Sequence, residues 1–232
     1  MMKGGQKVGA VIVAAGGSQR MGGIDKLLVQ LGGEPLLLHA TRPFQESSLV
    51  SQVVVVVGSE NKERCQYLVA GGEWSKVSDV CLGGERRQDS VAVGLERLER
   101  CDWVIIHDGA RPLVTVDLIE RGLMVAQETG AAVAAVPVTD TIKVAGDDKI
   151  VSRTLSRKEL WAVQTPQVFR ADIMTEAYLK AEGSVTDDAS LVEKLGYRVK
   201  LYMSSYDNIK VTTHHDLALA ELIQSRREEL HQ

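Results

Sequence analysis

Five short runs of mostly apolar, largely β-branched residues are separated by segments long enough to form helices. The runs lack the alternation of a half-exposed strand, which is typical of strands covered on both faces of a sheet. They lie at Val8–Ala14, Val53–Val57, Val77–Cys81, Trp103–His107 and Ala131–Val136. Helices are predicted at Glu34–Gln45, Asn61–Val69, Gln88–Leu98 and Val116–Glu128. The pattern predicts an α/β fold: a Rossmann-like, mostly parallel sheet flanked by helices.

The alternation stops after the fifth run. Residues 139–157 contain two short extended runs around Gly146-Asp147-Asp148, which predicts a β-hairpin. An isolated hairpin is marginal in water, so we expect this protruding arm to serve dimerisation. The remaining predicted elements are helices at Arg170–Ala181 and Asp188–Lys194, a strand at Arg198–Tyr202 and a helix at Asp216–Leu230. No linker is evident, so residues 1–232 are expected to form one domain.

Composition narrows the possible partners and the location. Hydrophobic residues make up 44% of the 232 residues, enough for one large core. The formal net charge of −4 argues against a nucleic-acid surface, which is usually basic. Three cysteines without a CxxC spacing are typical of reduced thiols in the cytoplasm. No apolar segment approaches the ~20 residues that span a bilayer, so no membrane partner is expected.

The first predicted strand runs into a glycine-rich, cationic stretch, AAGGSQRMGGIDK, at residues 14–26. Glycines permit close approach by a ligand, and successive backbone N–H groups in such a loop can bind an anion. Arg20 and Lys26 would add positive charge beside phosphate oxygens. The spacing matches neither a Walker A loop nor the dinucleotide fingerprint. Phosphate binding is the favoured function of this stretch, and a surface loop without a ligand is the alternative.

Asp108 and Arg111, in the stretch HDGARP, follow a predicted buried strand. They should therefore lie at the carboxyl edge of the sheet, where ligands of such sheets bind. A carboxylate there is suited to Mg²⁺ or a sugar hydroxyl, and an arginine to a phosphate. The alternative is an ion pair that shapes the turn. We expect His107 to be structural, with a pKa near its ordinary value.

Some polar residues have simpler interpretations when taken alone. Ser90, in GGERRQDSV, is close enough to a predicted helix start to cap it. Arg86 and Arg87 of the same stretch are expected to be solvated. Lys210, in DNIKVT, is typical of a surface charge.

Seven motifs in order resemble one family. The stretch AAGGSQRMGGIDK resembles the signature of nucleotidyltransferases that act on sugar phosphates, although Ser18 replaces its second glycine. The other six motifs are GGERRQDSV, HDGARP, VPVTDTIK, LWAVQTPQVF, TDDAS and DNIKVT. Together they resemble the 2-C-methyl-D-erythritol 4-phosphate cytidylyltransferase family over residues 8 to about 222.

This resemblance implies a reaction, a dimer and a set of site residues. The reaction is transfer of CMP from CTP to 2-C-methyl-D-erythritol 4-phosphate, with Mg²⁺ and release of pyrophosphate, in non-mevalonate isoprenoid precursor synthesis. The implied catalytic residues are Arg20, Lys26 and Lys210, and the implied nucleotide-binding residues are Ala14, Ala15, Gly16, Gly84, Glu85 and Ser90. The implied substrate-binding residues are Asp108, Arg111, Thr141, Arg157, Thr165 and Thr186, with Asp108 and Asp207 as metal candidates. In the implied homodimer, the arm of one subunit reaches the site of the other.

Two other functions remain open from the sequence. A sister enzyme would use ribitol 5-phosphate as the acceptor, although TDDAS and the LW before QTPQ favour methylerythritol phosphate. A binding module without catalysis is the second alternative. Retention of Arg20, Lys26, Arg157 and Lys210 argues against it, because loss of such cations is a simple route to inactivity.

Overall fold

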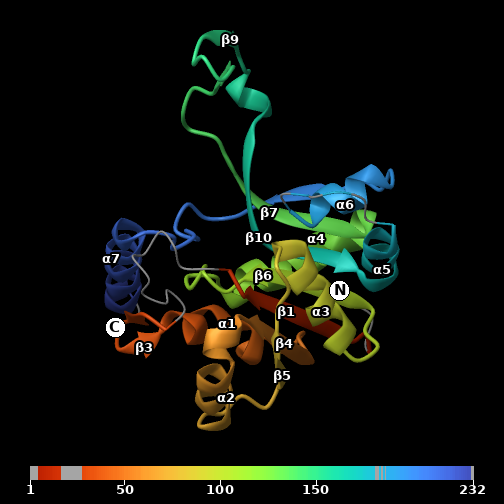
Figure 1. Cartoon of the computed structure of the whole chain (residues 1–232), viewed down its shortest axis with the longest axis vertical. Helices are drawn as coiled ribbons and strands as arrows, with labels where there is room; N and C mark the ends of the chain where they lie inside the picture. Colours follow the sequence, from red (N-terminus) through yellow and green to blue (C-terminus); the bar gives the residue numbers. More distant parts are fainter. Residues whose placement is uncertain (1–4, 17–27, 181–182, 184, 186, 231–232) are drawn as a thin grey trace.

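The computed structural model describes residues 5–16, 28–180, 183, 185 and 187–230. A seven-stranded sheet with the order β11-β7-β10-β6-β1-β4-β5 forms its centre (Figure 1). The strands are β1 (Val8–Ala14), β4 (Gln52–Val57), β5 (Val77–Leu82), β6 (Trp103–Asp108), β7 (Ala131–Pro137), β10 (Trp161–Arg170) and β11 (Lys200–Met203). Only the pairs that β10 forms with β6 and β7 are antiparallel. The predicted mostly parallel sheet is confirmed.

Helices cover both faces of this sheet. One face carries α1 (Leu36–Glu46), α2 (Lys62–Ala70) and α4 (Val116–Thr129), with the short 3₁₀ turn η2 (Ser59–Asn61) before α2. The other face carries α3 (Arg87–Arg97), α5 (Ala171–Leu179) and α6 (Ala189–Lys194). At one side, α7 (His214–Leu230) contacts β2 (Gln30–Leu31), which pairs with β3 (Glu34–Pro35). In the part of the chain that the structure describes, no helix has the length and apolar character needed to cross a membrane.

This three-layer arrangement explains the unbroken apolar runs. In β1, Ile12 belongs to the hydrophobic cluster under α1 and α4, whereas Val11 belongs to the cluster under α3. Successive side chains of a strand point to opposite faces, so a doubly covered sheet needs apolar residues at every position. Gly94 allows α3 to approach closely, because a Cβ there would lie 2.3 Å from the Cγ1 atom of Val11.

The predicted strands and helices are confirmed with small shifts at their ends, but β10 is not among the predicted elements. Its sequence is neither a continuous apolar run nor an alternating one. Gln164, Thr165 and Pro166 interrupt it, and its pairing with β7 shifts register between Val163 and Gln167. The local pattern therefore resembles a loop, and only pairing on both sides makes it a strand.

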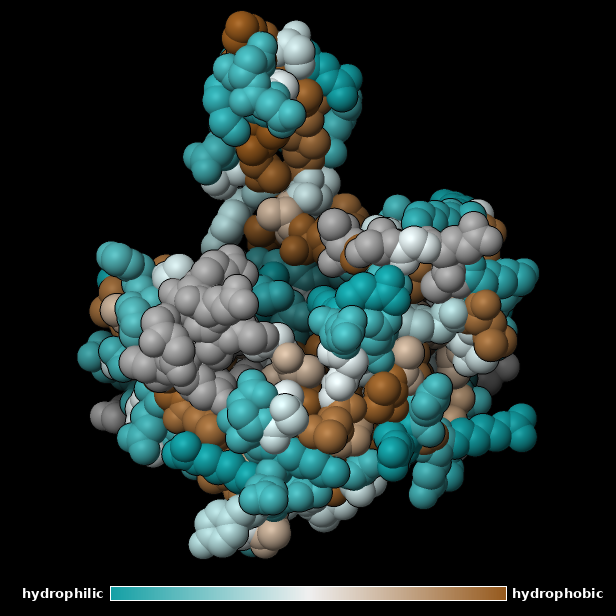
Figure 2. Space-filling model, viewed as in Figure 1, coloured by the Kyte–Doolittle hydropathy of each residue, from teal (hydrophilic) through white to brown (hydrophobic). Residues whose placement is uncertain are grey.

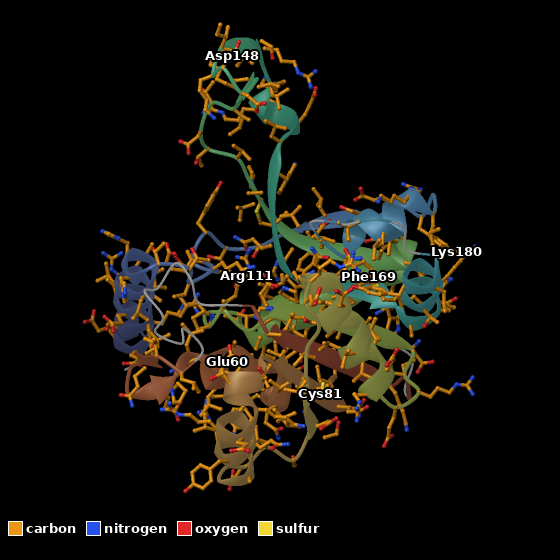
Figure 3. The ribbon with its side chains drawn as sticks, in the orientation of Figure 1. Glu60, Cys81, Arg111, Asp148, Phe169 and Lys180 are labelled. Carbon is orange, nitrogen blue, oxygen red and sulfur yellow. The ribbon has the colours of Figure 1, made fainter. Side chains whose placement is uncertain are left out.

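The arm, residues 139–157, leaves the sheet after β7 and returns before β10 (Figure 1). Its two strands, β8 (Lys143–Ala145) and β9 (Val151–Thr154), pair antiparallel, and the 3₁₀ turn η3 (Arg157–Glu159) follows. Figure 3 shows Asp148 at the far end, well away from Arg111 near the centre of the molecule. The dimerisation role of the arm stays a prediction.

Hydrophobic side chains are exposed on the arm and near its base (Figure 2). The exposed residues of these segments are Ile142, Ile150, Val151, Trp161, Val163, Leu201 and Met203. The last two belong to β11, one of the two edge strands of the seven-stranded sheet. Contiguous apolar surface on a soluble domain is typical of an interaction surface.

Candidate active site

The carboxyl ends of the parallel strands bring the first glycine-rich stretch and the turn before α3 together. A Cβ atom on Gly83 would lie 2.4 Å from the Cβ of Ala15 and 2.6 Å from the Oγ of Ser90. The backbone N–H of Gly83 also donates to the carbonyl of Val57 at the end of β4. Three predicted nucleotide-binding positions, Ala15, Gly84 and Ser90, therefore lie around one tight backbone junction.

The start of α3 is capped by an arginine rather than by Ser90. Asp89 accepts a hydrogen bond from the backbone N–H of Arg86 (3.1 Å), and the two side chains form an ion pair of 2.6 Å. Ser90 lies inside the helix, where its hydroxyl lies within hydrogen-bond distance of the carbonyls of Gly84 (3.4 Å) and Arg86 (3.2 Å). The capping role considered for Ser90 is wrong; its hydroxyl contacts the turn.

Asp108, at the end of β6, is the centre of a cluster of three cations. Its Oδ1 accepts a hydrogen bond from the Nε of Arg87 (3.2 Å), and its Oδ2 accepts one from the Nζ of Lys210 (2.7 Å). The Nε of Arg111 lies 3.8 Å from the same Oδ2. Burial alone would raise the pKa of Asp108, but the charges of Arg87, Lys210 and Arg111 outweigh it and hold the pKa well below its usual value.

Arg87 is not solvated, contrary to the expectation from sequence. Its guanidinium bridges Asp108 and Asp188, with 2.7 Å between its NH1 and the Oδ2 of Asp188. Burial lowers the pKa of Arg87, but the two carboxylates raise it further, so the side chain stays charged. The first turn of α3 faces the end of β6 and the start of α6. Arg87 therefore points between these elements, whereas Arg86, just before the helix, is half-exposed.

His107 has the structural role expected of it, but not the expected pKa. It is fully buried, and burial lowers its pKa to about 4. Its Nε2 lies 3.1 Å from the carbonyl of Arg111, and its Nδ1 lies 3.0 Å from the hydroxyl of Thr165. A carbonyl only accepts, so Nε2 carries the hydrogen and Nδ1 accepts from Thr165.

Thr165, a predicted substrate-binding residue, lies beneath the cluster. Its hydroxyl donates to His107 and accepts from the backbone N–H of Asp108 at 3.0 Å. The side chain is buried. Its structural function here is to connect β10 to the end of β6 and to orient the Asp108 backbone.

The loop that carries Lys210 is anchored by Asn208. The Nδ2 of Asn208 donates to the side-chain carbonyl of Gln164 and to the backbone carbonyl of Thr165, both at 2.9 Å. The backbone carbonyl of Asn208 accepts a hydrogen bond from the NH1 of Arg111 at 2.7 Å. These hydrogen bonds of Asn208 hold the loop, and with it Lys210, at the carboxyl edge of the sheet. In this structure Arg111 therefore supports the loop of Lys210 as well as facing Asp108.

A complete metal site is not formed by the described residues, among which no group of three His, Cys, Asp or Glu side chains is placed to hold an ion. Asp207 is about half exposed and lies 3.8 Å from Arg227. The three cations around Asp108 would repel a divalent ion in this arrangement. The fit of these side chains to a Mg²⁺ ion is therefore poor.

The remaining predicted site residues fall into three groups. Thr141 and Arg157 are exposed on the arm, where the NH1 of Arg157 donates to the carbonyl of Thr139 at 2.6 Å. Ala14, Gly16 and Glu85 lie in the segments that end β1 and precede α3. Arg20, Lys26 and Thr186 lie outside the described residues.

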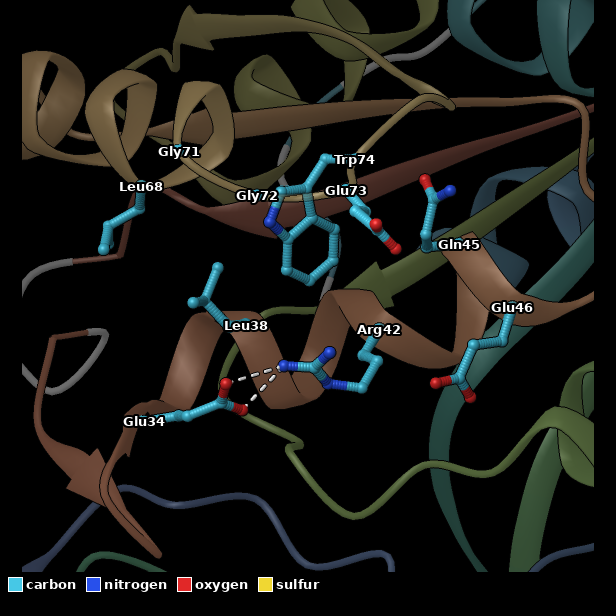
Figure 4. A pocket seen from close by; sticks show the side chains of 10 residues that line it. All are labelled: Glu34, Leu38, Arg42, Gln45, Glu46, Leu68, Gly71, Gly72, Glu73 and Trp74. Atoms are coloured by element: carbon cyan, nitrogen blue, oxygen red, sulfur yellow. Dashed lines mark hydrogen bonds and ion pairs between the residues drawn. The ribbon is translucent and has the colours of Figure 1, made fainter.

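A cavity of about 510 Å³ opens between α1 and the loop after α2, away from this cluster (Figure 4). Arg42 there forms two hydrogen bonds with Glu34, at 2.9 and 2.7 Å, and its guanidinium lies 5.5 Å from the ring centre of Trp74. None of the predicted site residues lines this cavity. The arginine is paired with Glu34, and the cavity holds none of the predicted site residues, so the sheet edge stays the candidate active site.

Residues 8–226 match the family described as 2-C-methyl-D-erythritol 4-phosphate cytidylyltransferase. A relative of that name from Dehalococcoides mccartyi is 50% identical over 218 residues, which cover 94% of this chain and 96% of the relative. Another, from Alkaliphilus oremlandii, is 43% identical over 229 residues, covering 96% and 97%.

Solved structures agree with this match. A 4-diphosphocytidyl-2C-methyl-D-erythritol synthase from Anaerococcus prevotii has a TM-score of 0.85 at 26% identity, covering 95% of this chain and 97% of its own. A 2-C-methyl-D-erythritol 4-phosphate cytidylyltransferase from Thermus thermophilus has a TM-score of 0.75 at 32% identity, covering 93% and 98%. Together with the sheet edge described above, these matches show that the chain belongs to the 2-C-methyl-D-erythritol 4-phosphate cytidylyltransferase family.

Proposed function

We propose that this chain transfers CMP from CTP to 2-C-methyl-D-erythritol 4-phosphate and releases pyrophosphate, in the non-mevalonate synthesis of isoprenoid precursors. The observation that carries the proposal is the cation cluster of Arg87, Arg111 and Lys210 around Asp108, beside the glycine turn before α3. Such a place suits two phosphorylated ligands at the carboxyl edge of a sheet. The names of the relatives favour methylerythritol phosphate over ribitol 5-phosphate.

The reaction needs no side-chain nucleophile. A phosphate monoester is already largely a dianion at neutral pH, since its second pKa is about 6. One of its oxygens attacks the α-phosphorus of CTP, a new P–O–P bridge forms, and the bond to the β-phosphate breaks, so pyrophosphate leaves. The barrier is mainly the approach of two anions and the charge that develops on the phosphoryl oxygens.

The residues have complementary roles in this proposal. Lys210, half-buried and aimed at Asp108, exchanges its carboxylate partner for phosphate oxygens when substrates bind. Arg20 and Lys26 neutralise the triphosphate and the leaving pyrophosphate. Gly84, Glu85 and Ser90 surround the cytosine, where the backbone at the turn is accessible to a flat base. Mg²⁺, brought by the triphosphate, would lower the charge on its oxygens.

We further propose a cytoplasmic homodimer in which the arm completes the partner's site. Thr141 and Arg157 belong to the arm, whose residue Asp148 lies well away from Arg111 of the cluster (Figure 3). A second subunit would also cover the exposed apolar side chains on the arm and on β11.

The proposal is tested by following the oxygens of the acceptor. The reaction would contain Mg²⁺, CTP and 2-C-methyl-D-erythritol 4-phosphate labelled with ¹⁸O in its phosphate. By ³¹P NMR and mass spectrometry, we expect all the label in the product that joins cytidine diphosphate to methylerythritol, and none in pyrophosphate. Label in pyrophosphate, or CMP without a coupled product, would contradict the proposed attack.

A further inference from the structure

Arg87 connects the Asp108 cluster to a second buried carboxylate, that of Asp188. It lies in the first turn of α3 and bridges two carboxylates from distant parts of the chain. Its Nε is 3.2 Å from the Oδ1 of Asp108, at the end of β6, and its NH1 is 2.7 Å from the Oδ2 of Asp188, just before α6. Both carboxylates are almost completely buried, so each needs a charged partner.

The two carboxylates differ in what else they contact. Asp188 has a second partner in the hydroxyl of Tyr178, which donates to its Oδ1 at 2.7 Å. Asp108 has Lys210 on its Oδ2 at 2.7 Å, whereas Arg111 remains 3.8 Å away, with a buried Nε that has no hydrogen-bond partner in the described part of the chain. Arg87 and Lys210 therefore provide the direct hydrogen-bonded compensation of the Asp108 side chain.

This arrangement has a consequence for Lys210. With Arg87 present, the negative charge of Asp108 is shared between two hydrogen-bonded cations. Lys210 can then leave the carboxylate, because Arg87 stays paired with it. Without Arg87, Lys210 would be the closest remaining cation to a buried carboxylate, and removing it would leave that charge nearly unpaired. The same ammonium would then be held more firmly and would be less available to a phosphate.

We propose that Arg87 is a positioning residue for phosphoryl transfer: by neutralising Asp108 from the side of Oδ1, it keeps Lys210 in place yet able to exchange Asp108 for a substrate phosphate. The inference rests on the proposed function for its kinetic consequence. Its structural consequence, the firmer hold of Asp108 on Lys210 when Arg87 is absent, does not depend on the identity of the substrates.

The test separates positioning from folding with a pair of variants. Arg87→Gln alone removes the cation paired with buried Asp188 and one of those paired with Asp108, and is expected to be destabilised. Adding Asp188→Asn removes one stranded charge and offers an amide partner to both the glutamine and Tyr178. Arg86→Gln is the matched control, because Arg86 is one position earlier, half-exposed and paired only with Asp89 among the contacts described above.

The expected result is that the double variant regains thermal stability but not turnover. We expect kcat at least tenfold below wild type with a smaller change in the KM for CTP, and near wild-type kinetics for Arg86→Gln. If turnover returns with stability to within about threefold of wild type, Arg87 is only a structural tie to Asp188, and the proposal is overturned.

A second measurement needs no turnover. Labelling of lysines with trace acetic anhydride, followed by mass spectrometry, reports how available each amine is; exposed Lys7 serves as an internal reference. In the double variant we expect labelling of Lys210 to slow several-fold relative to Lys7. An unchanged rate overturns the proposal. If the wild-type protein shows no turnover but labelling of Lys210 still slows in the double variant, the proposed function is rejected. The positioning of Lys210 by Arg87 would then still hold.

Discussion

At the scale of single residues, the site consists of one buried carboxylate and the cations that surround it. Asp108 carries a negative charge that burial disfavours, and Arg87, Arg111 and Lys210 more than compensate for it. Counting Asp188 as well, the five groups carry a formal net charge of +1. Lys210 is the most exposed of the three cations, so an arriving phosphate meets it first.

Lys210→Gln should reduce catalysis far more than stability. Its charge is the part of the cluster that faces the substrates, and removal of one such group typically lowers kcat by a factor of about 100 to 1,000. Arg87 still compensates Asp108, so the unfolding temperature should change by only a few degrees. Steady-state kinetics and thermal unfolding measure both effects. Lys200→Gln, which removes a surface ion pair with Glu128, is the control; turnover by Lys210→Gln close to wild type would refute the role of Lys210.

The low pKa of His107 predicts how the stability of the folded chain depends on pH. Its pKa is about 4 in the folded chain, below the ordinary value of 6.5, so the unfolded chain binds its proton more readily. The stability contributed by neutral His107 is therefore complete above pH 6.5 and is lost as the pH falls toward 4, a change of about 3 kcal/mol.

The measurement is denaturant unfolding of wild type and His107→Gln between pH 7 and 4.5. Glutamine keeps a donor toward the carbonyl of Arg111 but does not titrate. The variant should be less stable at pH 7, and the gap should narrow as the pH falls. If the free energy of unfolding falls equally with pH in the two proteins, burial of neutral His107 does not contribute to the acid sensitivity.

At the scale of secondary-structure elements, the site is a meeting of three separate segments. The turn before α3, the end of β6 and the loop before α7 converge at the carboxyl edge of the sheet. Thr165 of β10 and Asn208 of the loop fasten them together through buried hydrogen bonds. β10 is thus the element that connects the C-terminal loop with the end of β6.

Gly83→Ala should weaken CTP binding without unfolding the chain. The new Cβ would lie 2.4 Å from the Cβ of Ala15, so the two nucleotide-binding segments must move apart. We expect the KM for CTP to rise roughly tenfold, which corresponds to about 1.4 kcal/mol, with a smaller effect on the KM for the acceptor. Gly71→Ala, where the nearest atom is 3.4 Å from the added carbon, is the control. An unchanged KM would show that this junction does not shape the nucleotide site.

Sequence patterns predicted the elements that are regular and left out those that depend on distant contacts. The apolar runs of β1, β4 and β6 have only one stable environment, a doubly covered sheet. β10 was not predicted, because its polar residues and Pro166 fit a strand only through its pairing with β6 and β7. Arg87 and Arg86 are adjacent and chemically identical, and only the packing of α3 against β6 and α6 makes Arg87 the less exposed of the two. A signal existed in the TDDAS motif, whose second aspartate, Asp188, is the partner of Arg87.

At the scale of the whole molecule, the arm and the cluster are separate parts of one chain. The arm projects from the sheet and presents exposed apolar side chains together with Arg157 (Figures 1 and 2). Its paired strands are short, and isolated hairpins are marginal in water. A second copy of the chain would both cover this surface and receive the arginine.

Mixed dimers provide the test of shared sites. Arg157→Ala damages only the arm and Lys210→Gln only the cluster, so a heterodimer of the two variants should contain one site with both parts intact. We expect up to half of the wild-type activity in purified heterodimers, against little activity in either parent. A confirmed heterodimer no more active than its parents would show that each chain completes its own site.

The central claim is that this sheet edge joins CTP to one particular sugar-alcohol phosphate. The most direct measurement is pyrophosphate release from Mg²⁺ and CTP with either 2-C-methyl-D-erythritol 4-phosphate or ribitol 5-phosphate, at matched concentrations. The account predicts rapid release with the first acceptor and little with the second. Release with ribitol 5-phosphate alone, or with neither acceptor, would contradict it.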